Sequence, residues 1–193
     1  YPCVLKPLVL SASRGVIRAD GAAEFVTAWP RLSAILAEAE VQALGEGARK
    51  ILVEDFVPGV EVALEGMLTD GRLTTLALFD KPDPLEGPFF QETIYVTPSR
   101  LPRAQQADVE RTVQRAVRAI GLERGAVHAG VRCNASGTYL LEAAPRSTGG
   151  LCARALRFGP VGNVGQVGAE RAASLEEVLL RAALRRDTAA LRR

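Results

Sequence analysis

The stretch VHAGVRCNASGTYLLEAAPR, residues 127–146, constrains the fold more than any other part of the chain, because it predicts an antiparallel hairpin. The NASG sequence in its middle is typical of a three-residue loop, residues 135–137, whose glycine takes the left-handed conformation. Such a loop sets the register of the whole hairpin and pairs Asn134 with Thr138. Every other pairing in the hairpin follows from this one.

This register assigns each residue to one of two faces, since side chains alternate along a strand. The predicted core face carries Ala129, Val131, Cys133, Tyr139, Leu141 and Ala143. The predicted polar face carries His128, Gly130, Arg132, Asn134, Thr138, Leu140 and Glu142. Gly130 therefore lies directly opposite Glu142, and the polar face has a carboxylate on one strand and no side chain across from it.

The composition excludes several classes of partner. The chain has 193 residues, of which 48% are hydrophobic and 24% charged, as in an ordinary soluble protein of one large or two small domains. A net charge of +2 gives no electrostatic footprint for nucleic acid, and 5% aromatic residues are too few for a base-stacking platform. No apolar run is long enough to span a membrane, and no secretory signal is visible.

Three cysteines, Cys3, Cys133 and Cys152, have no metal-ligand spacing and indicate reduced thiols in a cytoplasmic protein. The chain opens on YPCVLKP, already inside an apolar strand, and closes on RDTAALRR, which is typical of a helix tail. We expect it to be a fragment of a longer protein.

Strands and helices alternate in a pattern that predicts an α+β fold. Strands are expected near residues 3–6, 16–18, 51–57, 60–68 and 72–79, with a tight turn at Asp70 and Gly71. The alternation in the strand over 60–68 would place Glu61 and Glu65 on one face. Helices are expected over residues 20–43, around 109–120, after 147 and from 174 onward, where SLEE is a capping-box start.

The helix around 109–120 would end at Gly121, and its apolar stripe would be Val109, Val113, Ala116, Val117 and Ile120. The first helix would have Asp20 as its N-cap, and Pro30 would kink or restart it. Its apolar stripe would be Phe25, Trp29, Leu32 and Leu36.

Between the fifth strand and the second helix, residues 80–102 contain five prolines and one β-like run at 92–96. A loop of this length in a compact domain is usually functional.

The first candidate for chemistry is Lys6, which ends an apolar strand and is expected to reach an anion or a carboxylate. The loop that follows contains Ser11, Ser13, Arg14 and Gly15, and small residues of this kind can wrap phosphate oxygens. It is not a Walker A sequence. The alternative is a polar turn beside a lysine that reaches solvent.

The second candidate is LVEDFVPGVEV, where a Pro-Gly turn should bring Glu54 and Glu61 close together beside Phe56 and Val57. Adenine fits an apolar slot edged by backbone donors and acceptors, and ribose hydroxyls suit a carboxylate acceptor. The alternative is a hairpin with solvated glutamates.

The third candidate is the end of the hairpin, where Glu142 could ligate Mg²⁺ and Arg146 could clamp a phosphoryl group or a carboxylate. The alternative is a surface ion pair between the two. STGG, residues 147–150, is rich in small residues that allow an anion to approach the backbone. His128 has no nucleophile partner in the sequence, which favours a hydrogen-bonded structural role, and Cys133 is expected to be buried and inert.

In order along the chain, YPCVLKP, the small-residue loop, LVEDFVPGVEV, LFDKPDP…PFFQETIYVTPS and LLEAAPRSTGG resemble the ATP-grasp superfamily. The resemblance covers roughly residues 1–158 and is strongest to the L-amino acid ligases, which are related to D-alanine–D-alanine ligase. It implies an ATP-grasp fold whose antiparallel sheets and flanking helices form a nucleotide clamp. The small lobe would be residues 1–60 and the large lobe 61–193, without the family's N-terminal domain.

The resemblance also implies an ATP- and Mg²⁺-dependent ligase, with Mn²⁺ as a substitute, that joins a carboxylate such as an amino acid to an amine through an acyl phosphate. A homodimer is compatible with it. The implied nucleotide-binding residues are Lys6, Ser11, Ser13, Arg14, Gly15, Val16, Glu54, Phe56, Val57 and Glu61. The implied substrate-binding residues are Lys81, Arg132, Gly149 and Gly150. Glu142 would be the metal ligand and Arg146 the catalytic group.

One departure from the family pattern divides the functional hypotheses. ATP-grasp proteins place an acidic residue on the first hairpin strand, and here that position is Gly130. The first hypothesis is a ligase core, inactive or weak as an isolated chain. The second is an ATP-binding module or pseudoenzyme with impaired catalysis. A kinase-like phosphotransferase would require a catalytic-loop Asp and Asn, which the sequence does not supply.

Overall fold

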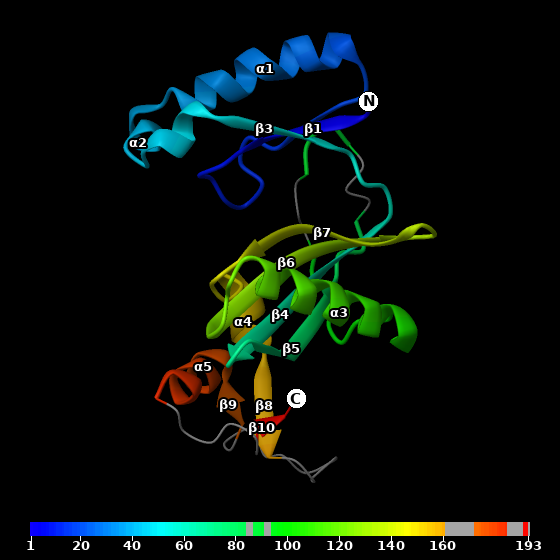
Figure 1. The fold of residues 1–193 in the computed structure, drawn as a ribbon, viewed down its shortest axis with the longest axis vertical. Coiled ribbons are helices and arrows are strands. Elements are labelled where there is room, and N and C mark those ends of the chain that lie inside the picture. The colour runs from blue at the N-terminus through cyan, green and yellow to red at the C-terminus, as the bar shows by residue number, and fades with distance from the viewer. Residues whose placement is uncertain (84–86, 91–93, 161–171, 185–190, 193) are drawn as a thin grey trace. The chain divides into compact units, whose positions relative to one another are not determined.

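The computed structural model describes residues 1–83, 87–90, 94–160, 172–184 and 191–192 (Figure 1). They form two compact units. The first consists of Tyr1–Pro58 and Asp83–Ile94, and the second of Gly59–Pro82 and Tyr95–Arg193. The sequence placed a lobe boundary after residue 60, two residues from the division at Pro58, but it assigned the second segment of the first unit to the large lobe.

The first unit is a small antiparallel sheet with strand order β2-β1-β3. Its strands are β1 (Cys3–Pro7), β2 (Ile17–Ala19) and β3 (Ile51–Asp55). Its helices are α1 (Ala22–Leu36), α2 (Ala39–Gln42) and the 3-10 turn η1 (Glu46–Arg49). Leu5, Ile17 and Leu32 are among the buried residues that join the sheet to α1.

Helix α1 differs from its prediction at both ends. Its N-cap is Gly21, which makes no side-chain cap, while Asp20 accepts a hydrogen bond from Arg18 Nε at 2.6 Å instead. The helix ends at Leu36 rather than near residue 43, because Glu38 leaves the helical conformation and α2 begins separately. Pro30 lies inside the helix without ending it. The buried stripe is Ala28, Leu32 and Leu36, and Trp29 is largely exposed.

The second unit is built on a four-stranded antiparallel sheet of order β5-β4-β6-β7. Its strands are β4 (Val60–Thr69), β5 (Arg72–Asp80), β6 (Gly125–Asn134) and β7 (Gly137–Ala144). The predicted tight turn between β4 and β5 is confirmed: Asp70 and Gly71 have φ of +48° and +73°, as a type I′ turn requires. The α+β fold class is confirmed as well.

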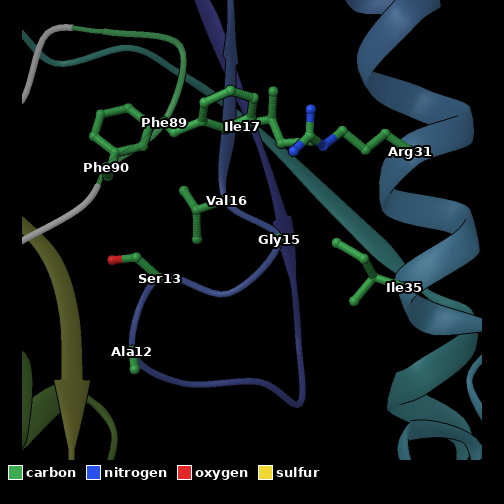
Figure 2. A pocket seen from close by; sticks show the side chains of 9 residues that line it. All are labelled: Ala12, Ser13, Gly15, Val16, Ile17, Arg31, Ile35, Phe89 and Phe90. Atoms are coloured by element: carbon green, nitrogen blue, oxygen red, sulfur yellow. The ribbon is translucent and has the colours of Figure 1, made fainter.

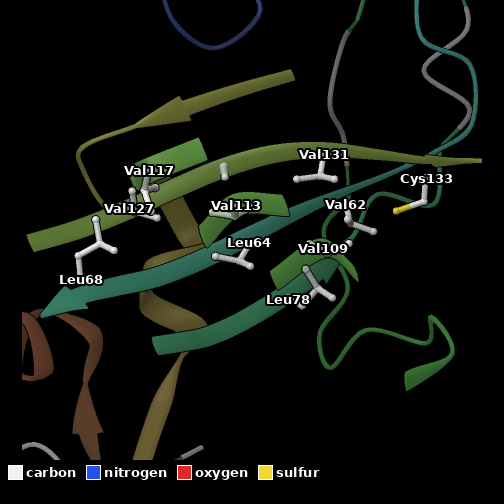
Figure 3. Close-up of a cluster of buried hydrophobic side chains, with 11 residues drawn as sticks. Val62, Leu64, Leu68, Leu78, Val109, Val113, Val117, Val127, Val131 and Cys133 are labelled. Carbon is white, nitrogen blue, oxygen red and sulfur yellow. The ribbon is translucent and has the colours of Figure 1, made fainter. Parts of the chain in front are cut away.

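Helix α3 (Arg103–Ala119) covers one face of this sheet. Val109, Val113 and Val117 repeat every four residues and pack against strand residues such as Leu64 (Figure 3). Ile120 was predicted to continue this stripe. It follows the last helical residue and is exposed, because the chain turns away at Gly121 with φ of +75°.

The opposite face of the sheet packs against the C-terminal elements through residues such as Met67, Phe79 and Phe158. These elements are α4 (Gly150–Ala155), β8 (Arg157–Pro160), β9 (Ala173–Ser174), α5 (Leu175–Ala183) and β10 (Leu191–Arg192). The predicted helix start at Ser174 is confirmed, since its hydroxyl accepts a hydrogen bond from Glu177 N at 3.2 Å.

In the hairpin of β6 and β7, Gly130 pairs with Glu142 as predicted, but the loop length and the strand register that produce this pairing differ from the prediction. The loop has two residues, so Asn134 pairs with Gly137 and not with Thr138. Asn134 Oδ1 holds this tighter turn by accepting from Ser136 N at 2.8 Å. A register shift after Gly130 then leaves Leu141 unpaired and restores the pairing of Gly130 with Glu142.

The prediction for the outer half of β7 was therefore wrong. Leu140, expected on the polar face, pairs with Val131 and packs against the core. Tyr139, expected in the core, pairs with Arg132 and is exposed, and Leu141 is the bulged residue. The two-residue loop moves the pairing of Thr138–Leu140 by one residue and so reverses which of their side chains point inward, and the bulge at Leu141 restores the predicted faces from Glu142 onward.

Part of the predicted β-like run at residues 92–96 lies outside the described residues. Its last residue, Val96, forms an isolated bridge with Asp80 through two backbone hydrogen bonds of 2.8 and 2.9 Å. No helix in the described ranges is long and apolar enough to cross a membrane.

Packing of α3 on the sheet predicts that Val113→Ala lowers the free energy of unfolding of the second unit by about 2 kcal/mol, because it leaves a cavity at a fully buried site. Val26→Ala, on the exposed face of α1, should change it by less than about 0.5 kcal/mol. Urea unfolding followed by far-ultraviolet circular dichroism measures both. Equal effects of the two substitutions would contradict this packing.

Candidate functional site

In the first unit, the strand register brings Lys6 and Glu54 together. Lys6 lies opposite Leu52, and Val4 lies opposite Glu54, so Lys6 and Glu54 share one face of the sheet. The Lys6 ammonium forms an ion pair with the Glu54 carboxylate. Both groups are partly exposed. The lysine thus reaches a carboxylate, as the sequence suggested, and two predicted nucleotide-binding residues are neighbours.

The loop at residues 11–15 is tightly wound. Ala12, Ser13 and Gly15 have φ of +54°, +56° and +80°, which is the left-handed region. Val16 N donates to Ser13 O at 3.1 Å and closes the turn. A Cβ at Gly15 would lie 2.9 Å from Leu32 Cδ1, so glycine is also needed where the loop packs on α1.

Arg14 is turned toward the chain after α1. Its guanidinium donates to Glu38 and, at 3.1 Å, to Glu40. These hydrogen bonds, chiefly the one to Glu38, raise the pKa of the Arg14 guanidinium. In this arrangement Arg14 holds the loop to the segment that separates α1 from α2. Its predicted nucleotide contact would require these exposed ion pairs to open.

A pocket in the first unit joins this loop to α1 and to the segment at residues 87–90 (Figure 2). Its lining residues are Ala12, Ser13, Gly15, Val16, Ile17, Arg31, Ile35, Phe89 and Phe90. Phe89 forms a bridge with Ile17, and Arg18 N donates to Pro88 O at 3.0 Å, so residues 87–90 extend the edge of the sheet at β2. The sequence did not predict this docking, which places two aromatic rings beside the predicted phosphate loop.

Phe56 and Val57 follow β3 in the same unit. The Arg18 guanidinium lies over the Phe56 ring at 3.9 Å from its centroid, and the rings of Phe56 and Phe90 are 6.4 Å apart. Phe56 N donates to Pro2 O at 3.1 Å. Glu54 belongs to this unit and Glu61 to the other, so their expected proximity stays a prediction.

In the second unit, three predicted site residues form one buried cluster. Glu61 on β4 lies directly opposite Arg132 on β6, whose Nε donates to Glu61 Oε2 at 2.9 Å. Lys81 Nζ donates to Glu61 Oε1 at 2.7 Å. The side chains of Glu61, Lys81 and Arg132 are only 11%, 6% and 2% exposed. Lys81 also lies over the Tyr95 ring, 5.2 Å from its centroid.

Burial of such a cluster is unfavourable in free energy, because each charge loses its hydration. Proteins retain buried charges where partners satisfy them, and often where a ligand uses them. One carboxylate that bridges two cations can give hydroxyl groups further acceptor sites, and the cations can attract phosphate or carboxylate oxygens.

A second buried carboxylate, Glu65, lies on the same face of β4 as Glu61, as the alternation predicted. Its Oε2 is 3.3 Å from His128 Nδ1 and accepts from Thr148 N at 2.8 Å. His128 therefore has the hydrogen-bonded, buried environment that the structural interpretation predicted. No role for Glu65 could be predicted from the sequence, because its contact with Thr148 spans 83 residues.

The end of the hairpin is open. The side chains of Glu142 and Arg146 are exposed, and Arg146 Nη1 donates to Ser147 O at 3.1 Å. Among the described residues Glu142 forms no ion pair, so the alternative of a surface Glu142–Arg146 pair is wrong for this structure. Gly149 and Gly150 are exposed with open space where a Cβ would lie, and Gly150 has φ of +63°.

Cys133 faces the core, as predicted, and burial raises the pKa of its thiol. It stays protonated and unreactive at neutral pH.

The hairpin has one exposed carboxylate, Glu142, that could hold a metal ion. Glu142 lies across from Gly130, and a Cβ at Gly130 would be 3.3 Å from Glu142 Cγ. The described parts of the chain contain no group of three His, Cys, Asp or Glu residues placed to hold a metal ion by themselves. Mg²⁺ usually binds through one or two carboxylates together with phosphate oxygens and water. With Glu142 alone, the hairpin has one carboxylate, the smaller of these two numbers.

Comparison with known proteins identifies the family. The ATP-grasp domain family matches residues 1–155. The chain belongs to the ATP-grasp family. Carnosine synthase 1 of Gallus gallus is 37% identical over 106 residues, which cover 55% of this chain and 11% of that protein. The alanine–anticapsin ligase of Bacillus amyloliquefaciens is 26% identical over 161 residues, which cover 77% of this chain and 34% of that protein.

Among solved structures, the L-amino acid ligase of Bacillus licheniformis superposes with a TM-score of 0.61 at 27% identity. The match covers 76% of this chain and 32% of that ligase. This ATP-grasp chain thus spans 11%, 34% and 32% of the lengths of these relatives. Its antiparallel sheets with flanking helices are those of the ATP-grasp fold.

The buried cluster predicts that Glu61→Ala lowers the free energy of unfolding by about 3 kcal/mol, because it leaves two buried cations without their carboxylate. Asp108→Ala, which breaks the exposed pair with Arg111 on α3, should cost less than about 0.5 kcal/mol. Thermal or urea unfolding of both variants measures the difference. A loss at Glu61 no larger than that at Asp108 would show that the cluster is not buried in solution.

Proposed function

We propose that this ATP-grasp chain is the nucleotide-binding core of an ATP- and Mg²⁺-dependent ligase that joins a carboxylate to an amine. The substrate carboxylate oxygen takes the γ-phosphoryl group of ATP and ADP leaves. The amine nitrogen then attacks the acyl carbon, phosphate leaves and the nitrogen loses a proton. The observation that carries the proposal is the buried Glu61–Lys81–Arg132 cluster in a chain of this family.

In the first unit, we assign the nucleotide contacts to Lys6, Glu54 and the loop at residues 11–16. Lys6 would bind phosphate oxygens and Glu54 would accept from the adenine amino group. The present ion pair between them keeps both groups compensated, and each has capacity for one more partner. The main-chain amides of the left-handed loop and its Ser11 and Ser13 hydroxyls would cover the phosphates. Phe56 and Val57 would contact the base through their backbone.

In the second unit, Glu61 would accept from the ribose hydroxyls while it continues to hold Lys81 and Arg132. Lys81 and Arg132 would attract the anionic groups of the substrate. Arg146, exposed and without a carboxylate partner among the described residues, would bind the transferred phosphoryl or acyl group in a bidentate manner. Gly149 and Gly150 would allow the substrate to approach the main chain closely.

Glu142 would hold Mg²⁺ at the end of the hairpin. The ion would neutralise phosphate charge when bound. Mn²⁺ prefers the same oxygen ligands and would substitute.

Amino acids are the substrate class that we favour for the carboxylate, since two of the similar proteins are named an alanine–anticapsin ligase and an L-amino acid ligase. Cys3, Cys133 and Cys152 are thiols rather than disulfides in this structure, which is consistent with a reducing, cytoplasmic location.

One observation favours a second candidate, an ATP-binding module with impaired catalysis. Gly130 lies opposite Glu142 and offers no ligand where a second carboxylate would complete a two-metal site. The two candidates differ in whether ATP is consumed. Incubation with ATP, Mg²⁺ and the twenty protein amino acids should release ADP, at the low rate expected of an isolated core, if the chain is a ligase core, and ATP should bind without ADP release if it is a module.

The ion pair in the first unit predicts the effect of one substitution on ATP affinity. Lys6→Ala should weaken ATP binding about tenfold, because it removes a charged hydrogen bond to phosphate. Isothermal titration with MgATP measures the affinity. Lys50→Ala, an exposed lysine just after η1, should leave it unchanged. Equal affinities of the two variants would contradict the assignment of Lys6.

A further inference from the structure

We propose that Glu65 is a positioning residue that fixes the main chain at Thr148 and thereby orients the loop at residues 147–150. That loop carries Gly149 and Gly150, so the inference rests on the proposed function of these residues as a substrate contact. Glu65 touches no predicted ligand itself. It acts through the backbone of the loop that follows β7.

The contact is a long-range hydrogen bond made by a carboxylate without solvent exposure. Glu65 lies in the middle of β4 with 0% of its surface exposed. Its Oε2 accepts from Thr148 N at 2.8 Å, and Thr148 is itself buried. Because β6 lies between β4 and β7 in the sheet, the Glu65 side chain ties the loop after β7 to a strand that is not its neighbour. A hydrogen bond to a buried charged acceptor is strong, because no water competes for either group.

His128 completes the environment of this carboxylate. It lies opposite Glu65 in the register of β4 and β6, and its Nδ1 is 3.3 Å from the same Oε2. Oε2 therefore has one ring nitrogen of the neighbouring strand and one backbone amide of the loop within hydrogen-bond distance.

The other carboxylate oxygen of Glu65, Oε1, does not take part in this contact with the loop. Oε1 is buried and has no hydrogen-bond partner among the described residues. Oε2 alone thus does the positioning, and the role needs an acceptor at that place rather than two oxygens. Glutamine can keep an oxygen at the Oε2 position and put its amino group where Oε1 lies, whereas methionine fills a similar volume without an acceptor.

The consequence for the loop is a change of direction at Thr148. Its amide points inward to Glu65, while the next two residues, Gly149 and Gly150, are exposed. Gly150 adopts φ of +63°, at which α4 begins. An anchored Thr148 fixes where this left-handed step occurs. Without the anchor the two glycines, which are the most flexible residues, would sample many conformations.

Hydrogen exchange of the unliganded chain tests the anchor directly. Glu65→Met should speed exchange of the Thr148 amide at least about tenfold, and Glu65→Gln should keep it within about threefold of the original chain. Asp80→Leu is the matched control, since Asp80 is a buried carboxylate that accepts from Arg100 N at 2.8 Å. It should speed exchange at Arg100 and leave Thr148 unchanged. Unchanged exchange at Thr148 in Glu65→Met, or equal exchange in the Met and Gln variants, would overturn the proposal.

A kinetic comparison tests whether the contact between Glu65 and Thr148 supports the reaction rather than ATP binding. With MgATP and the amino-acid mixture, Glu65→Met should lower the rate of ADP formation about tenfold while the MgATP dissociation constant stays within about twofold, and Glu65→Gln should restore the rate. A general loss of structure would weaken both. Accelerated exchange with an unchanged rate would overturn the positioning role. If the original chain neither binds ATP nor forms ADP, the proposed function fails, and the exchange experiment still decides whether Glu65 holds the loop.

Thr148→Pro removes the same hydrogen bond from the donor side and serves if Glu65→Met does not fold. It should accelerate exchange of the hydrogen-bonded amides of α4, which begins at Gly150, and lower the rate of ADP formation as Glu65→Met would. Unchanged exchange in α4 would overturn the proposal.

Discussion

The Glu61 carboxylate, which accepts from Lys81 and Arg132, is the interaction on which the second unit and its proposed chemistry depend. The carboxylate that lies between two nearly buried cations compensates charge on both of them. The sheet makes this possible, since the register of β4 and β6 places Glu61 directly opposite Arg132. Lys81 arrives from the end of β5, and its amide donates to Glu61 O at 3.1 Å. The same strand pairing places Glu65 opposite His128, four residues farther along β4 than Glu61.

Local signals in the sequence predicted much of this architecture. The Asp70–Gly71 turn, the valine stripe of α3 and the cap at Ser174 each depend on residues a few positions apart, and all three are confirmed. The hairpin shows how a correct pairing can rest on two errors that cancel. The loop is one residue shorter than predicted, the bulge at Leu141 compensates, and Gly130 still meets Glu142. The shorter loop reverses the faces of Tyr139 and Leu140, and the bulge, which has no reliable local signature, restores the faces beyond it.

The parts of the site that the sequence did not predict depend on contacts between distant segments. Phe89 and Phe90 reach the edge of β2 from a proline-rich stretch that the sequence assigned to the other lobe. Arg14 pairs with Glu38 and Glu40, which the sequence placed inside one long helix. Glu65 was recognised only as a neighbour of Glu61 on the strand. Each of these contacts requires tertiary packing to be known before the partner can be named.

The proposed function places Mg²⁺ at the end of the hairpin, where Glu142 would hold it and Gly130 leaves the place of a second carboxylate without a ligand. The Glu142 side chain is exposed and can shift by the few tenths of an ångström that a Cβ at position 130 requires. Thermal unfolding of this chain and of Gly130→Glu, each with ATP alone and with ATP and Mg²⁺, tests this proposal directly, because a ligand that binds the native state raises the midpoint. We expect ATP to stabilise both chains and Mg²⁺ to add a much larger increase in Gly130→Glu. No response to ATP in either chain, or the same Mg²⁺ increment in both, would show that the metal is not held at this place.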